Sequence, residues 1–428
     1  VSTALFFVAI LHTFLVGKFA KMAHKFPTGS VGENLFHLLS EVEVVFLFWS
    51  GILMTILYLV AKGEGSLGYL ESLHFTEPLF VFVIMIISAT KPIIDLADRA
   101  IRKIDYYTPF HGSMGFLATA LILGPLLGSV ITEPAAMSLT ALILFRAFFS
   151  RDISMNLKYA IMAALFVNVS IGGSLTNFSA PPVIMVAGVD KWNWDLMFMM
   201  TQFGWKATLA VIFNAYFVAW KFRTELRKLP LQSDSDLKGK EAALIKNVPV
   251  WVSLVHIAFL AFTVINAHHP VLFMGGFIFF LGFAHVAREY QEPLKVRDAL
   301  LVAGFLGGLI TLGTLQSWWI QPLLANSGEL SIFIGAVLLT SVTDNAALTY
   351  LASQVQGLSS MKQYFVVAGA LAGGGTTVIA NAPNPVGYSV LRSGFGEKGL
   401  DPIRLLKAAL LPTLVAVACF LWLPGVSL

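Results

Sequence analysis

Two acidic residues lie inside long apolar stretches of this chain, one in each half. Glu133 belongs to the segment 132–136, which reads TEPAA, and Asp344 belongs to the segment 343–347, which reads TDNAA. A carboxylate in the hydrocarbon layer of a bilayer costs about 2.5–3.5 kcal/mol on insertion scales, so an acid at that depth is usually functional. A proton and a small cation both neutralise a carboxylate, and they can compete for it. The two acids are therefore predicted to carry protons and cations; the alternative is that each caps the helix that follows it.

Each acid is followed by a segment that combines glycine and proline with polar side chains. The first segment, 172–182, reads GGSLTNFSAPP, and the second, 374–384, reads GGTTVIANAPN. Glycine and proline interrupt helices, and irregular backbone at membrane depth is tolerated only where it is buried in protein or lines a cavity. The segments supply hydroxyls, amides and freed carbonyls, which are hard oxygen ligands suited to a small cation. We expect a binding site where these broken segments meet the two acids.

Two lysines also lie within or close to apolar stretches. Lys206 is well inside its stretch, and because a buried lysine needs a partner, we predict an ion pair between Lys206 and Glu133. Lys407 is close to the start of its stretch, from which its ammonium group can reach the membrane interface. Both lysines are candidate ion- or proton-binding residues, and both could instead hold an anion.

The composition is that of a membrane protein. Of the 428 residues, 57% are hydrophobic and only 12% are charged, with a mean hydropathy of +0.78, whereas about a quarter of the residues in a soluble domain are charged. Apolar runs of about 17–25 residues, the length of a helix that crosses a bilayer, recur along the chain. We predict an all-α polytopic membrane protein whose partners are the lipid bilayer and small inorganic ions. Lys and Arg cluster in short loops between the runs, which argues against a nucleic-acid partner.

The sequence gives no support for an enzyme or for a bound cofactor. Cys419 is the single cysteine, so neither a disulfide nor a cysteine-based zinc site can form within the chain. No Walker motif, Gly-rich nucleotide fingerprint or HExxH motif is present, so ATP-driven transport would need a separate subunit. An intramembrane aspartyl protease would need both acids at one site, but no GxGD sequence surrounds Asp344.

The apolar runs follow the same order in the two halves of the chain. Each half has three helices, an interrupted stretch predicted to be a re-entrant hairpin, a Gly/Pro-broken helix and a last helix, which indicates an internal repeat. The first repeat is predicted at 1–220 and the second at 247–428, with a cytoplasmic linker at 221–246. The predicted spans are 1–20, 35–62, 76–97, 112–149, 156–190 and 196–220, then 247–266, 270–287, 298–320, 329–355, 363–391 and 402–424.

Motif matches and loop charges support a repeat that is inverted in the membrane. The two acid motifs match at a separation of 211 positions, the double glycines that begin at 172 and 374 match at 202, and the two lysines match at 201. Five crossings per half, an odd number, would invert the second half. With the linker in the cytoplasm, 22 of the 28 Lys and Arg residues fall in cytoplasmic loops and three in the opposite loops, as the positive-inside rule requires. We predict ten crossings, two opposed hairpins and both termini outside.

Two motifs of the second half resemble a known superfamily. The sequences SVTDNAAL at 341–348 and GGTTVIANAPNP at 374–385 are similar to the paired signatures of the ion transporter superfamily, which includes sodium-coupled dicarboxylate carriers, arsenite permeases and NhaD-type antiporters. The adjacent Asp344 and Asn345 resemble the antiporter branch, and the chain is similar to the putative Na+/H+ antiporter family within it. The resemblance implies scaffold and transport parts in each repeat, a homodimer, and a location in the bacterial inner (plasma) membrane.

The resemblance also implies a set of ion-binding residues at the hairpin tips and in the broken segments. The first half departs from the family pattern at Pro134 and Pro182, where asparagines are expected, so the second half is predicted to hold the better-formed cation site. Na+ would be bound by Asp344, Asn345 and Glu133. The remaining candidates carried by the same motifs are Thr132, Thr343, Asn381, Asn384, Thr376, Thr377, Ser174, Thr176 and Asn177.

These observations together predict a secondary active transporter that exchanges Na+ (or Li+) for H+ by alternating access, with Glu133 and Asp344 as paired carriers. Na+ would be a transported or coupling ion, not a resident cofactor. One alternative stays open within the same superfamily, namely a Na+- or H+-coupled symporter of a carboxylate or another small anion, for which Lys206 and Lys407 would hold the anion.

Overall fold

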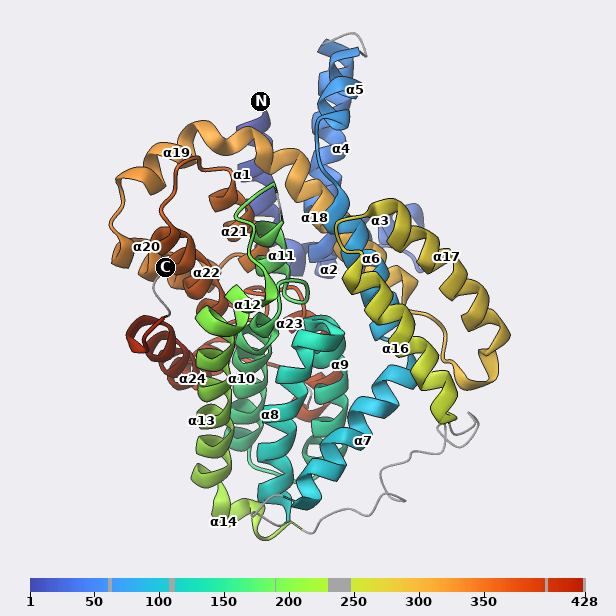
Figure 1. Cartoon of the computed structure of the whole chain (residues 1–428), viewed down its shortest axis with the longest axis vertical. Coiled ribbons are helices and arrows are strands. Elements are labelled where there is room, and N and C mark those ends of the chain that lie inside the picture. The colour runs from blue at the N-terminus through green and yellow to red at the C-terminus, as the bar shows by residue number, and fades with distance from the viewer. Residues whose placement is uncertain (61–63, 108–111, 189, 230–247, 397–398, 426–428) are drawn as a thin grey trace. The chain divides into compact units, whose positions relative to one another are not determined.

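The computed structural model describes residues 1–60, 64–107, 112–188, 190–229, 248–396 and 399–425. Every regular element in these residues is a helix, which confirms the all-α prediction (Figure 1). Most of the predicted linker, from residue 230 onward, lies outside the described residues. The helices form two compact units: the first comprises Val1–Phe82, Val296–Ser327 and Tyr350–Leu358, and the second comprises Val83–Lys295, Gly328–Thr349 and Ser359–Leu428. Each unit combines segments from both halves of the chain, and the repeat boundaries stay a prediction.

The first unit is organised around α4 (Val42–Val60), which is mainly apolar after Glu43 in its first turn. Helix α18 (Val296–Gly313) packs along it, and the approach is so close that a methyl group added at Gly308 would lie 2.4 Å from the backbone of Phe46 and Leu47. The other elements of this unit are α1 (Ser2–Thr13), α2 (Val16–Ala23), α3 (Val31–Leu39), α5 (Glu64–Glu71), the first part of α6 (Thr76–Ser88), η6 (Thr314–Gln316), α19 (Ser317–Asn326) and the end of α21 (Asn345–Ser353).

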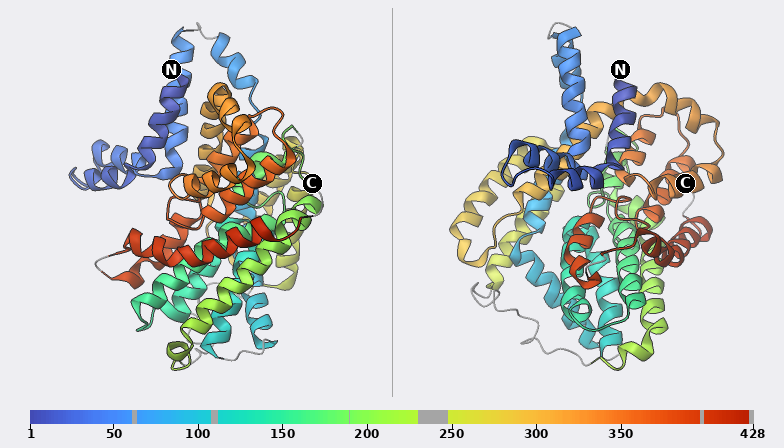
Figure 2. Two further views of the ribbon diagram at one scale, coloured as in Figure 1. Left: turned by 90° about the vertical axis from the view of Figure 1, so that its left-hand side faces the viewer. Right: turned by 180° about the vertical axis from the view of Figure 1, so that it is seen from behind.

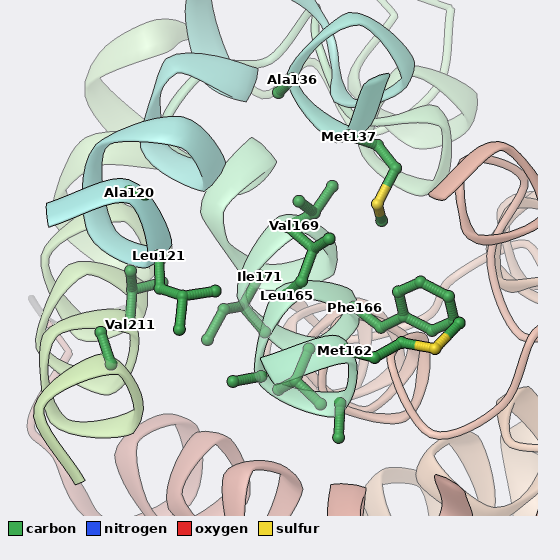
Figure 3. Close-up of a cluster of buried hydrophobic side chains, with 14 of the residues drawn as sticks. Ala120, Leu121, Ala136, Met137, Met162, Leu165, Phe166, Val169, Ile171 and Val211 are labelled. Atoms are coloured by element: carbon green, nitrogen blue, oxygen red, sulfur yellow. The ribbon is translucent and has the colours of Figure 1, made fainter. Parts of the chain in front are cut away.

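The second unit is built around α10 (Met155–Gly172), which is buried along nearly its whole length. A helix that is apolar on all sides must be enclosed by others. Helices α8 (Ser113–Ile131), α9 (Glu133–Leu144), α13 (Trp205–Lys221) and α24 (Pro402–Trp422) pack against it. Figure 3 shows Phe166 and Val169 of α10 in the core that they form, with Leu121 of α8 and Met137 of α9 nearby. Figure 2 shows α24, in red, lying against α13.

Shorter helices complete the second unit. Helix α20 (Glu329–Thr340) packs along α22 (Ser360–Gly373), and α16 (Val250–Ile265) packs against α17 (Pro270–Val286) and α7 (Lys91–Tyr107). The remaining elements are η1 (Phe145–Phe149), η2 (Gly173–Leu175), α11 (Pro181–Ala187), α12 (Leu196–Met199), η3 (Met200–Gly204), α14 (Arg223–Leu226), η5 (Arg288–Tyr290), the first part of α21, α23 (Asn384–Leu391) and η7 (Arg392–Phe395).

Six helices among the described residues are long and apolar enough to cross a membrane, and up to eight if each of two bent pairs counts as one span. The apolar helices α16, α17 and α20 are shorter. These helices fit a multi-pass membrane protein, while the number of ten crossings stays a prediction.

Two predicted spans are in fact pairs of helices. The span predicted at 1–20 consists of α1 and α2, which meet at an angle of 64°. The span predicted at 76–97 ends with α6 at Ser88, and the amphipathic α7 begins at Lys91. Pro92 explains the second break, because proline lacks the amide hydrogen that would continue the preceding helix and is tolerated in the first turn of a new one.

Candidate functional site

The first acid lies at the tip of a helical hairpin. Helix α8 ends at Ile131 and α9 begins at Glu133, and between them Thr132 has φ 76° and ψ 150°. A methyl group added at Gly124 would meet Thr140, and one added at Gly128 would lie 3.3 Å from Ala136 Cβ. Because these contacts run in opposite directions along the chain, α8 and α9 are antiparallel.

The side chain of Glu133 is fully buried and only partly hydrogen-bonded. Its Oε2 accepts a hydrogen bond of 2.9 Å from Asn381 Nδ2, whereas Oε1 has no partner among the described residues. The carboxyl group also packs on the start of the first broken segment, since a methyl group added at Gly173 would lie 2.5 Å from Oε1. Glu133 thus brings the hairpin tip of the first half into contact with broken segments from both halves.

Three buried asparagines of the second half have side-chain oxygens without partners among the described residues, and one of them, Asn381, contacts this carboxyl. Asn345, Asn381 and Asn384 are each at most 1% exposed, and the Oδ1 atom of each has no hydrogen-bond partner among the described residues. Buried polar atoms almost always have partners because burying them unpaired is costly. The unpaired oxygens make these three asparagines candidates for contact with an electropositive ligand, and Asn345 Nδ2 likewise has no partner among the described residues.

Backbone contacts hold these asparagines along the second broken segment. Asn384 Nδ2 donates to the carbonyls of Gly374 and Thr377, both at 2.8 Å. The amide of Asn345 donates to the carbonyl of Ala380 at 3.1 Å, directly before Asn381. Carboxylate and amide oxygens are the ligand types that a small hard cation prefers.

The two halves make matching hydrogen bonds in this region. Thr176 Oγ1 donates to the carbonyl of Ser129 at 2.8 Å, and Thr377 Oγ1 donates to that of Ser341 at 2.9 Å. The separation is 212 positions between the two serines and 201 between the two threonines.

The same separations apply to the acid motif. The amide of Glu133 donates to the carbonyl of Ser179 at 3.5 Å, as the amide of Asn345 does to Ala380. Asn345, and not Asp344, is therefore the structural counterpart of Glu133. The motif alignment, with its separation of 211, is shifted by one residue.

Asp344 has a different environment from Glu133. It is only partly buried, and its Oδ1 accepts hydrogen bonds from the amides of Ala346 at 2.8 Å and Ala347 at 3.2 Å. These are the bonds of a residue that caps the N-terminus of the following helix, here α21. Helix capping, the alternative role considered for both acids, thus describes the geometry of Asp344.

Most of the other candidate hydroxyl and amide groups donate to main-chain carbonyls. Ser174 Oγ donates to Ile171, Thr376 Oγ1 to Gly373, Thr343 Oγ1 to Leu339, and Asn177 Nδ2 to Trp194, at distances between 2.6 and 3.0 Å. Thr132 Oγ1 lies 3.4 Å from Ser88 Oγ. These contacts fix the shape of the tips and broken segments, so these residues position the site more than they face it.

The two candidate lysines do not join this site. Lys206 is 2% exposed, and its Nζ donates to the hydroxyl of Tyr364 at 2.9 Å. That hydroxyl donates to the carbonyl of Phe420 at 2.8 Å. The predicted ion pair between Lys206 and Glu133 is not formed, because Lys206 is hydrogen-bonded to Tyr364 and Glu133 to Asn381. Lys407 is exposed and lines a separate cavity.

Two positioning residues were not predicted. Ser129 Oγ donates to the carbonyl of Gly172 at 2.7 Å and accepts from the amide of Leu175 at 3.0 Å, which ties α8 to the first broken segment. Ser129 could have been predicted from the sequence, because a serine also stands at the matching position 341 of the second half. Tyr364 has no comparable signal, since it lies 158 positions from Lys206.

A comparison with protein families identifies the family to which the chain is similar. A family model described as putative Na+/H+ antiporter matches residues 1–423, which include both halves and all of the candidate residues. No curated protein matches the chain. The family match and the apolar helices together identify an integral, multi-pass membrane protein of a transporter family.

Proposed function

Because this chain belongs to the putative Na+/H+ antiporter family, we propose that it exchanges Na+ (or Li+) for H+ across the membrane by alternating access. The observation that carries this proposal is the fully buried carboxyl of Glu133, which leaves Oε1 without a partner among the described residues. An intramembrane acid in such surroundings is most simply explained by an ion that it holds during transport.

Competition at one carboxyl group explains the exchange. A proton on Glu133 makes the group neutral, and a Na+ beside the ionised carboxylate neutralises it as well, so the site holds one or the other. The buried asparagine oxygens of the site can coordinate Na+ but are not protonated in its place. The site therefore alternates between a protonated form and a sodium-bound form, and each form can be presented to a different side of the membrane.

We assign the carrier role to Glu133 before Asp344. The carboxylate of Asp344 already accepts two backbone amides at the start of α21, which leaves it less available for an ion. In this proposal Asp344 fixes the N-terminus of α21 and thereby the position of Asn345. The matching hydrogen bonds in the two halves support two related broken-helix elements, as alternating access in inverted-repeat transporters requires.

Proteoliposomes that contain the purified protein and a dye sensitive to ΔpH test the proposal. Addition of Na+ should dequench the dye with the wild type, and Glu133→Gln should reduce the response to that of empty liposomes, because glutamine keeps the shape but cannot ionise. Glu329→Gln, which changes an exposed acid of α20, is the matched control and should behave as the wild type.

A normal response from Glu133→Gln, or none from the wild type, would refute the proposal. Uptake of labelled carboxylate or bicarbonate driven by a Na+ gradient, without a response to ΔpH, would instead establish the alternative anion symporter.

A further inference from the structure

A cavity of about 400 Å3 lies among α10, α13 and α24 in the second unit. Three basic side chains line it, namely Lys221 at the end of α13 and Arg404 and Lys407 near the start of α24. Aromatic and apolar side chains, among them Tyr159 and Leu411, form the rest of its wall. We refer to this cavity as the basic groove.

The positive charge of the basic groove is not offset by any acidic side chain of its wall. No acid lines the groove, and none of its three cations forms an ion pair within the described residues. Arg404 lies 5.3 Å from the ring centroid of Tyr159, and Lys221 Nζ lies 5.8 Å from that of Phe217. Cation–π contacts orient these groups without cancelling their charge, so the groove suits an anion.

The position of the groove identifies the kind of anion. Three candidate membrane spans end here, because α10 begins at Met155, α13 ends at Lys221 and α24 begins at Pro402. The groove therefore lies at the level where hydrocarbon gives way to head groups. Beside it, α13 and α24 expose large apolar side chains toward the bilayer: Phe213 is 53% exposed, Leu410 51% and Leu414 60%.

We propose that the basic groove binds the phosphate head group of an anionic phospholipid, with its acyl chains along the apolar faces of α13 and α24. Arginine and lysine form charge-assisted hydrogen bonds with phosphate oxygens, and basic pockets between membrane helices bind anionic head groups. The apolar faces favour a lipid over a free phosphate ion, because a free phosphate ion would make no contact with them. This site is separate from the proposed ion-exchange site and does not depend on it.

Native mass spectrometry of the full chain in detergent, with added phosphatidylglycerol or phosphatidylcholine, tests this proposal. The wild type should retain phosphatidylglycerol about tenfold more than phosphatidylcholine, a preference of about 1.4 kcal/mol. The triple variant Lys221→Gln/Arg404→Gln/Lys407→Gln should lose this preference. The triple variant Arg227→Gln/Lys228→Gln/Lys295→Gln removes the same charge from exposed positions outside the groove and should keep it.

The single variant Lys407→Gln guards against misfolding of the triple variant, because this side chain is exposed; it should lower phosphatidylglycerol retention in part. Equal retention of the two lipids by the wild type, or an unchanged preference in both groove variants, would overturn the proposal. Displacement of phosphatidylglycerol by millimolar inorganic phosphate would overturn it in favour of a soluble anion.

Discussion

The carboxyl of Glu133 depends on the absence of a side chain at Gly173. A methyl group there would lie 2.5 Å from Oε1 and 2.6 Å from Cγ of Glu133, closer than non-bonded atoms allow. We expect Gly173→Ala to displace the carboxyl and to slow Na+-driven proton release in proteoliposomes by about tenfold or more, since a loss of 1.4 kcal/mol in the transport barrier already has that effect.

The matched control for this substitution is Gly275→Ala, in the middle of α17. No atom lies within 4 Å of a methyl group added there, and alanine favours a helix by up to about 1 kcal/mol over glycine. Transport should then equal that of the wild type, and thermal stability should be equal or higher. If Gly173→Ala transports at the wild-type rate, the close contact between Gly173 and the carboxyl does not shape the site.

Lys206 and Tyr364 form a buried pair whose energy can be measured. Tyr364→Phe removes the acceptor for Lys206 Nζ and the donor to Phe420, so it should destabilise the protein by about 1–3 kcal/mol. In a Lys206→Met background the same change should cost less, because no buried charge is left unpaired. Thermal unfolding in detergent gives the four values of this double-mutant cycle.

The exposed Tyr58, whose hydroxyl needs no internal partner in α4, supplies the control Tyr58→Phe, which should leave the unfolding temperature unchanged. Equal costs of Tyr364→Phe in the two backgrounds would mean that the lysine and the tyrosine do not interact.

The sequence predicts which polar residues are special more readily than it predicts their partners. Glu133, Asn345 and Asn381 could be found because polar groups in apolar runs are costly and therefore conspicuous. The bond between Glu133 and Asn381 joins positions 248 apart, and no local pattern encodes it. The alignment of the two acid motifs was off by one residue for a related reason. The letters TxxAA match at Glu133 and Asp344, but a shift of one residue on a helix turns a side chain by about 100°. Packing, which the letters do not show, decides which residue faces the site.

At the scale of elements, the hairpin tip stores backbone strain. Thr132 has φ 76° and ψ 150°, a region that a β-branched residue rarely adopts and that costs about 1–3 kcal/mol. Thr132→Gly should relieve this strain and raise the unfolding temperature, although greater freedom of the unfolded chain offsets about 0.5–1 kcal/mol of the gain. Transport should slow, because a more flexible tip holds the amide of Glu133 less firmly against Ser179.

Thr132→Ala is the matched comparison, since alanine keeps the Cβ atom and loses the γ-methyl group and the hydroxyl beside Ser88. It should be no more stable than the wild type. If glycine and alanine at this position give the same unfolding temperature, the tip is not strained.

Element boundaries could be predicted where glycine or proline interrupts an apolar run. The breaks after α8 and after α10 fall at the predicted places, beside Pro134 and at the Gly172-Gly173 pair. The bend between α1 and α2 was missed because Phe14 and Leu15, the two residues between these helices, are not helix-breaking residue types. Proline at position 92 did indicate the start of α7, but the apolar residues around it led to the prediction of one continuous span at 76–97.

At the scale of the whole molecule, the two halves were predicted to contribute one buried carboxyl each. The matching contacts assign a buried carboxyl to the first half alone. Asn345 occupies in the second half the place of Glu133 in the first. In the proposed mechanism one carboxyl exchanges one H+ for one Na+, which moves no net charge, whereas each extra charge is worth about 2.3 kcal/mol per 100 mV. A potential imposed with K+ and valinomycin should therefore leave the rate of exchange within about twofold. A several-fold change would assign a second proton, and Asp344 would be the first candidate to carry it.

The predicted inversion of one half relative to the other can be tested on the whole chain. Ser170 Oγ on α10 donates to the carbonyl of Leu371 on α22 at 2.8 Å, and these positions are 201 apart, the same separation as between the paired threonines. Two repeats that cross at equivalent positions are what a pseudo-two-fold axis produces, and such an axis in the membrane plane inverts one repeat relative to the other. The loop charges independently favour the same arrangement.

Single cysteines in a Cys419→Ala background test this arrangement with an impermeant maleimide. The changes Asp152→Cys and Glu292→Cys, in loops predicted to be cytoplasmic, should be labelled only after the cells are permeabilised. Asp190→Cys and Asn326→Cys should be labelled in intact cells. All four positions are exposed, so failure of labelling reports the membrane and not burial in the protein. If Asp152 and Glu292 are found on opposite sides, the halves are not inverted as predicted, and the hairpins cannot enter the membrane from opposite faces.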